Sequence, residues 1–314
     1  MTTTEPAPPR SKRAPHAAAT VVLLRDGEGK PEVFLLRRAG GAGFMANATV
    51  FPGGKVDAQD HELGPALSVE HTASIGHALD SDIIGVLGNF GAAVRELCEE
   101  AGVVLARTDT GAIVAPEVAA AVAAAVTGER DGHRVPAAAF RRALHSHGLV
   151  ADMSAVAPFA WWVTPHAEPV RFNTLFFCAV LPAGQSAAVD GVEGTEGQWV
   201  TAQAAIAIHN AGGRQMLPPP TLHTLLRIAA LAGDAAAVCA ALAARSVGPM
   251  LMPHFVAEGA DGPHGKDGPF IAMPDDPAHP DALADDADRR HRFVLRGDRF
   301  VHFAHAARLG PLEL

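Results

Sequence analysis

One short stretch decides the fold: Arg95-Glu96-Leu97-Cys98-Glu99-Glu100-Ala101-Gly102-Val103. Its three glutamates stand at positions i, i+3 and i+4, which lie on one face of an α-helix. Glycine is the residue type that most often ends a helix in the left-handed conformation, and Gly102 occupies that place. The pattern therefore predicts a helix over residues 89–101 that carries three carboxylates on a single face.

Three like charges on one helical face repel one another. A like-charged pair at i, i+4 costs an isolated helix about 0.2–0.5 kcal/mol, and burial increases the penalty until a proton or a cation relieves it. Ligands that are all oxygen atoms suit magnesium or manganese, which also bind substrate phosphates. We therefore expect Glu96, Glu99 and Glu100 to hold Mg²⁺ or Mn²⁺, with Arg95 pairing with one of them and orienting it.

The alternative is that these acids form a solvated helical face, which is the commoner outcome for a Glu-rich helix. The upstream sequence Phe51-Pro52-Gly53-Gly54 argues against this alternative. Two adjacent glycines allow the backbone to approach a metal ion or a phosphate closely.

The acidic segment resembles the Nudix box, Gly-x5-Glu-x7-Arg-Glu-U-x-Glu-Glu-x-Gly-U, where U is aliphatic. Residues 95–103 match it at every fixed position, and the first half begins at Gly54. Asp60 stands where the family has its first Glu, and 34 residues separate it from Arg95 where the family has seven. The box is therefore split by an insertion at about residues 61–88.

The resemblance extends to one branch of the family, the large Nudix hydrolases that include the mammalian peroxisomal coenzyme A diphosphatase. It covers roughly residues 17–310. The segments that carry it are Phe44-Met45, Val50–Gly54, Trp162–Pro165, Arg171–Thr174, Phe176-Phe177, Glu193 with Trp199, and Pro218–Thr221.

The resemblance implies an α/β/α sandwich on a mixed β-sheet and hydrolysis of a pyrophosphate bond. The Gly54 carbonyl would join the three glutamates as a metal ligand. In the family a box glutamate or an acid from a distant loop takes the proton from water; Glu99 is the first choice here, Glu193 the second and Glu196 the third. Arg95 completes the catalytic set, and the residues expected to bind substrate are Arg37, Arg38, Phe51, Gly53 and Arg171.

The substrate expected from the branch is coenzyme A or acyl-coenzyme A. ADP-ribose, NADH or a dinucleotide is the enzymatic alternative. A second alternative is a non-catalytic Nudix-like regulator that binds a nucleotide, but such a binder has no need of the complete acidic set that this chain carries.

Composition and sequence patterns argue against several other classes of protein. The net charge of −9 argues against nucleic-acid binding, which needs a dense basic face. No apolar stretch is long enough to cross a bilayer. The apolar run at 17–24 ends without a small-residue cleavage site, and the cysteines show no zinc-type or redox spacing. We expect a cytoplasmic monomer or homodimer that acts on a small nucleotide-derived molecule.

The chain divides into three parts by composition. Residues 1–16 predict a disordered tail, 17–245 the Nudix domain with two decorating helices at about 115–150, and 246–314 a C-terminal extension packed on that domain. The histidines at 254–305 are expected on loops and the surface. Strands are expected at 17–25, 32–38, 158–164, 172–181, 196–200, 250–256 and 292–303, the last with a two-residue turn at Gly297-Asp298. Helices are expected at 201–210, 219–232 and 234–245.

Overall fold

The computed structural model describes most of the chain, and four expectations fall outside the described residues. These are most of the 1–16 tail, most of the 61–88 insertion, Glu193 and the turn at 297–298. The described residues are 14–40, 45–63, 75–76, 83–131, 135–136, 138–189, 191, 194–212, 215–244, 247–256, 261–262, 265–266, 269–282, 291–296 and 299–304.

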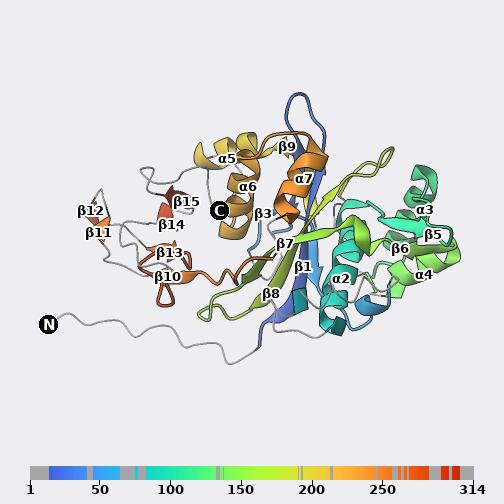
Figure 1. Ribbon diagram of the computed structural model, residues 1–314, viewed down its shortest axis with the longest axis horizontal. Helices are drawn as coiled ribbons and strands as arrows, with labels where there is room; N and C mark the ends of the chain where they lie inside the picture. Colours follow the sequence, from blue (N-terminus) through green and yellow to red (C-terminus); the bar gives the residue numbers. More distant parts are fainter. Residues whose placement is uncertain are drawn as a thin grey trace.

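A seven-stranded mixed sheet forms the centre of the fold (Figure 1). Its order is β3-β2-β1-β8-β7, with β4 also paired to β1 and β9 to β2. β1 and β8 run parallel, whereas the other pairs are antiparallel. The strands are β1 (His16–Arg25), β2 (Glu32–Arg38), β3 (Thr49–Val50), β4 (Gly53–Lys55), β7 (Ala157–Val163), β8 (Phe172–Val180) and β9 (Gly194–Thr201).

The central strand β1 is buried on both faces, as its continuous apolar run predicts. Val21 and Leu23 join the core cluster that contains α2 (Ile83–Ala101). Val22 and Leu24 join a second cluster on the opposite face. Three helices cover that second face: α5 (Ala202–Asn210), α6 (Pro219–Ala229) and α7 (Ala235–Ala243). The expected α/β/α sandwich is therefore confirmed.

Helix α2 begins at Ile83, six residues earlier than the sequence pattern predicts. The glycines near its start resemble loop residues in sequence, but here they allow close packing. A Cβ on Gly91 would lie 2.0 Å from the carbonyl oxygen of Asp60, and one on Gly88 would lie 3.0 Å from Val56. Gly88 and Gly91 have low helix propensity, but they allow the segment after β4 to lie against the helix. Gly102 ends the helix at a φ of +68°, as expected.

The decorating helices are found where the sequence predicts them, at the side of α2 (Figure 1). They are α3 (Pro116–Gly128) and α4 (Ala138–Ser146), and a ribbon of β5 (Ala106–Thr108) and β6 (Leu149–Ala151) accompanies them. Among the described helices, none combines the length and apolarity needed to cross a bilayer.

The C-terminal segment builds a second, antiparallel sheet in the order β10-β13-β14-β15. It contacts the first unit directly: Met273 and Phe293 join the core cluster of α5, α6 and α7, and the His209 ring lies 2.6 Å from the Phe300 carbonyl oxygen. β13 is not among the expected strands. The strands of this sheet are β10 (His254–Val256), β13 (Phe270–Ala272), β14 (His291–Arg296) and β15 (Arg299–Ala304), and β11 (Asp261–Gly262) pairs with β12 (Gly265–Lys266) in a separate ribbon.

The expectation that the histidines of this segment lie on loops and the surface is wrong for several of them. His291 is buried on β14, and its ring stacks on buried His223 of α6 at 5.4 Å and meets His302 of β15 at 5.3 Å. Burial, followed by the charge that His291 can carry, lowers the pKa of His302 to about 4. Burial also lowers the pKa of His223. The rings of His223 and His302 accordingly act as neutral packing elements between α6 and the second sheet.

This cluster predicts acid sensitivity. The pKa of His302 falls from its ordinary 6.5 to about 4 on folding. Between those values the unfolded chain binds a proton that the folded chain refuses, so stability decreases as the pH falls from 6.5 towards 4. We expect His302→Gln to flatten this part of the profile of unfolding free energy against pH, measured by urea denaturation. Replacement of exposed His145 should leave the profile unchanged, and an equal effect of both substitutions would contradict the assignment.

Candidate active site

The guanidinium of Arg95 is the centre of the site and is almost completely buried, at 4% exposure. Its Nε donates to Oδ1 of Asp60 at 2.8 Å and its Nη2 to Oδ2 at 3.0 Å, a bidentate pair. Nη2 also donates to the Lys55 carbonyl oxygen at 2.9 Å. Asp60 is itself 1% exposed and accepts a hydrogen bond from the Asp57 backbone. The pair therefore joins α2 to the segment that follows β4.

Two of the predicted metal ligands share the remaining Arg95 nitrogen. Nη1 donates to Oε1 of Glu96 at 2.8 Å and to Oε1 of Glu99 at 3.3 Å. Burial by itself lowers the pKa of Arg95, but the charges of Glu96, Asp60 and Glu99 outweigh burial and raise it. Arg95 therefore stays charged and holds both glutamates beside one nitrogen atom.

The third glutamate is held by the backbone of β4. Oε2 of Glu100 accepts a hydrogen bond from the Gly53 backbone N–H at 2.7 Å. A Cβ on Gly54 would lie 2.4 Å from Oε1 of Glu96, so a larger residue there would displace the Glu96 carboxylate. Glycine at position 54 thus allows the Glu96 carboxylate to lie directly against the backbone of β4.

These contacts bring Glu96 and Glu99 to Arg95 and Glu100 to the Gly53 N–H, while their role as metal ligands stays a prediction. Among the described residues, however, no group of three or more His, Cys, Asp or Glu side chains is arranged to hold a metal ion as it stands. Arg95 and the Gly53 N–H take up carboxylate charge instead. The donors are oxygen atoms throughout, which is the chemistry that magnesium and manganese prefer.

The predicted substrate-binding arginines of β2 lie near one predicted acid. Arg37 Nη1 is 3.8 Å from Oε1 of Glu196, a carboxylate that is 67% exposed. The Nε atoms of Arg37 and Arg38 are buried, and neither has a hydrogen-bond partner among the described residues. Buried donors without an acceptor are costly, so these atoms are candidates for binding an anion.

Two other predicted substrate-binding residues are engaged within the fold. Arg171 is buried, and its Nε donates to the Thr164 carbonyl oxygen at 3.0 Å while its Nη2 lies 4.0 Å from the sulfur of Met252. Phe51 is 3% exposed and packs in the core beneath α5 and α6. Their part in substrate binding stays a prediction, as does the role of Glu193.

Two contributions to the site were not expected from the sequence. The first is that Asp60, at the first acidic position of the box, serves as the counter-ion of Arg95. The second is Asn89, which is 7% exposed and donates from Nδ2 to the Ala18 carbonyl oxygen at 2.9 Å, pinning α2 to β1. In the sequence, Asn89 is an amide inside an otherwise apolar helical turn, and this pattern indicates a buried polar contact.

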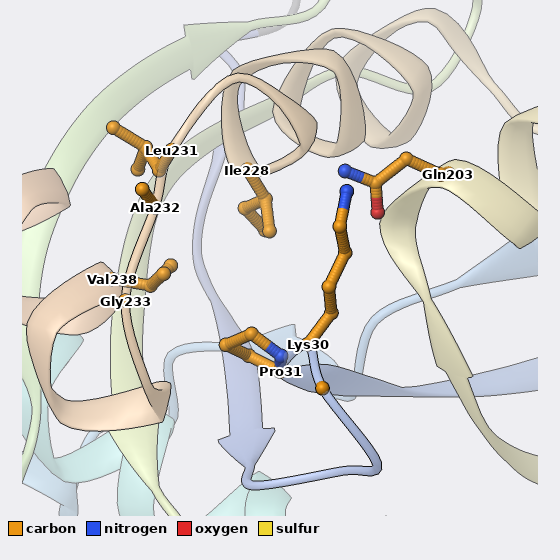
Figure 2. Close-up of a pocket in the computed structure, with 9 residues that line it drawn as sticks. Lys30, Pro31, Gln203, Ile228, Leu231, Ala232, Gly233 and Val238 are labelled. Carbon is orange, nitrogen blue, oxygen red and sulfur yellow. The ribbon is translucent and has the colours of Figure 1, made fainter.

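A cavity of about 250 Å³ lies on the other side of the sheet (Figure 2). Lys30 from the β1–β2 connection and Gln203 of α5 point towards each other across it, and Ile228 and Val238 form its apolar wall. None of the predicted site residues lines it.

Comparison with known proteins identifies relatives with a similar fold and sequence. No family model matches the chain. A solved Nudix hydrolase from Alicyclobacillus acidocaldarius superposes with a TM-score of 0.56 at 26% identity, covering 70% of this chain and 94% of that one. The chain is thus similar to the Nudix hydrolases. The acyl-coenzyme A diphosphatase NUDT19 of Xenopus laevis is 25% identical over 228 residues, which are 63% of this chain and 59% of that relative. The match thus spans less than two thirds of the relative.

The buried pair of Arg95 and Asp60 predicts a large difference between two acids of one turn. Asp60→Ala leaves the Arg95 charge without its bidentate partner and should destabilise the fold by about 3 kcal/mol. Glu62 lies two residues away and pairs with Arg141 in solvent. Glu62→Ala should therefore cost less than about 1 kcal/mol. Urea unfolding of both variants measures the difference, and equal losses would refute the role given to Asp60.

Proposed function

We propose that the chain hydrolyses the pyrophosphate bond of a nucleoside diphosphate derivative with the help of Mg²⁺ or Mn²⁺, and that coenzyme A or acyl-coenzyme A is its substrate. The observation that carries the proposal is the convergence of three glutamates on Arg95 and the Gly53–Gly54 turn. A solvated acidic face would not require a buried arginine or a glycine in contact with a carboxylate.

The residues that would hold the metal are Glu96, Glu99, Glu100 and the carbonyl of Gly54. A bound divalent ion neutralises charge on the diphosphate and lowers the pKa of a coordinated water molecule. The contacts of Glu96 and Glu99 with Arg95 fix the position of both carboxylates before a ligand binds. A metal ion would compete with Arg95 for these oxygens, so its binding would require some rearrangement of the carboxylates.

The reaction needs a base, an anion clamp and an in-line water molecule. Glu99 is our first choice for the base, because Arg95 orients it at the edge of the cluster; Glu193 and then Glu196 are the alternatives. The base takes a proton from water as the water oxygen attacks one phosphorus, and the anhydride P–O bond breaks so that the other phosphate leaves. Arg37 and Arg38 would bind phosphate oxygens through their buried guanidinium nitrogens.

The choice of substrate is supported by the name of the Xenopus laevis relative, an acyl-coenzyme A diphosphatase, and by the segments shared with that branch. Attack within coenzyme A would release adenosine 3′,5′-bisphosphate and a phosphopantetheine product. ADP-ribose, NADH and dinucleotides are the alternatives, and a non-catalytic nucleotide-binding regulator is the alternative outside enzymes. We further propose a cytoplasmic monomer or homodimer.

The test is a panel of coenzyme A, acyl-coenzyme A, ADP-ribose, NADH and a dinucleoside polyphosphate, assayed with the full chain and Mg²⁺ or Mn²⁺. We expect adenosine 3′,5′-bisphosphate from the first two. Glu99→Gln and Glu100→Gln should lower kcat at least about 100-fold, because each removes a carboxylate from the reacting centre. Exposed Glu117→Gln on α3 is the matched control and should keep full activity.

Two results would reject parts of the proposal. Near-normal turnover after Glu99→Gln or Glu100→Gln would reject the assignment of the catalytic cluster. Tight nucleotide binding without any product would favour the regulator.

A further inference from the structure

Two thiols on the face opposite α2 lie unusually close together. The Sγ atoms of Cys178 on β8 and Cys239 on α7 are 3.0 Å apart. A disulfide bond measures about 2.05 Å between its sulfur atoms, so an approach of about 1 Å would bring the two to bonding distance. Both are free cysteines, and they are separated by 61 positions in sequence, so no local motif announces the pair.

The surroundings hold both sulfur atoms in this arrangement. Cys178 is completely buried, and its Sγ lies 3.5 Å from the carbonyl oxygen of Ala157 on β7 and 3.3 Å from that of Cys239. α7 packs on β7 and β8, with Val238 and Leu242 in the shared core. The thiols therefore face each other between packed elements, where encounter requires no loop to reorganise.

The two sulfur atoms differ in the way that stepwise oxidation requires. Cys239 is only partly buried, whereas Cys178 is fully enclosed. The hydrogen bond between the two thiols, followed by burial, raises the pKa of Cys178, while the same hydrogen bond lowers the pKa of Cys239. Cys239 is thus the more accessible and more acidic thiol, and Cys178 is positioned to resolve its oxidised form.

We propose that Cys178 and Cys239 form an oxidative modification site, at which a peroxide converts the two thiols into a disulfide that ties α7 to β8. The Cys239 thiolate attacks the peroxide O–O bond, giving a sulfenic acid and releasing hydroxide, which is protonated to water. The Cys178 sulfur then attacks the sulfenic sulfur, the S–S bond forms, and the hydroxyl group leaves as a second water molecule with the Cys178 proton. Two electrons pass from the thiol pair to the peroxide.

The consequence is mechanical, because the bond would join helix α7 to the central sheet. The bond would close a loop that contains β9, α5 and α6, and closing a loop of this length stabilises the folded state relative to the unfolded chain. Cys98 lies on the other face of the sheet, on α2, where burial and then Glu99 raise the pKa of its thiol. It serves as an internal control that should not react.

The experiment treats the reduced full-length chain with a small excess of hydrogen peroxide, followed by alkylation, digestion and mass spectrometry. We expect a peptide pair joined through Cys178 and Cys239, two hydrogens lighter than its reduced parts, and Cys98 as a free thiol. The oxidised protein should melt roughly 5–10 °C higher than the reduced one, and dithiothreitol should reverse the shift.

Variants separate the bond from other effects of oxidation. Cys239→Ser should abolish both the joined peptide and the melting shift, whereas Cys98→Ala should retain both. Three results would overturn the proposal: no joined peptide after peroxide treatment, sulfinic acid on Cys239 beside a free Cys178 thiol, or a disulfide that includes Cys98. The mass measurement on the unmodified sequence decides the matter even if a variant fails to fold.

Discussion

The rest of the site depends on one buried ion pair, Arg95 with Asp60. A guanidinium that is removed from water is tolerated only when acceptors surround it. Here Asp60, the Lys55 carbonyl and two glutamates provide them, so a single side chain connects α2, β4 and the turn after it. The two glutamates are held in place by the same charge that the fold has to satisfy, which makes the acidic cluster part of the structure and not an appendage to it.

Two glycines allow the elements around Arg95 to pack this closely. At Gly54 the strand backbone lies against the Glu96 carboxylate, and at Gly91 the helix backbone lies against Asp60. A side chain at Gly54 would displace the Glu96 carboxylate, whereas one at Gly91 would collide with the Asp60 backbone. The separation of α2 from the segment after β4 is therefore set by backbone contact at Gly91, while the mixed sheet behind them supplies the apolar surface on which α2 rests.

Much of this arrangement follows from local sequence. The spacing of the three glutamates places them on one helical face. The apolar runs of β1 and β2 predict those strands, because a strand buried on both faces has a nearly continuous apolar sequence. What could not be predicted rests on contacts between distant residues. The role of Asp60 depends on a partner 35 positions away. The early start of α2 depends on packing against Val56 and Asp60. His291 is buried against helix α6, which is distant from it in sequence. The closeness of Cys178 and Cys239 arises in the same way.

The most direct test of the central claim is calorimetric titration of Mn²⁺ into the full chain and into a Glu96→Gln, Glu99→Gln, Glu100→Gln variant, with circular dichroism to verify that both are folded. If the carboxylates gathered around Arg95 form the metal site, the original chain should bind Mn²⁺ saturably, and the variant should lose at least about tenfold in affinity. Equal affinity in the two folded proteins, or no binding by the original chain, would contradict it.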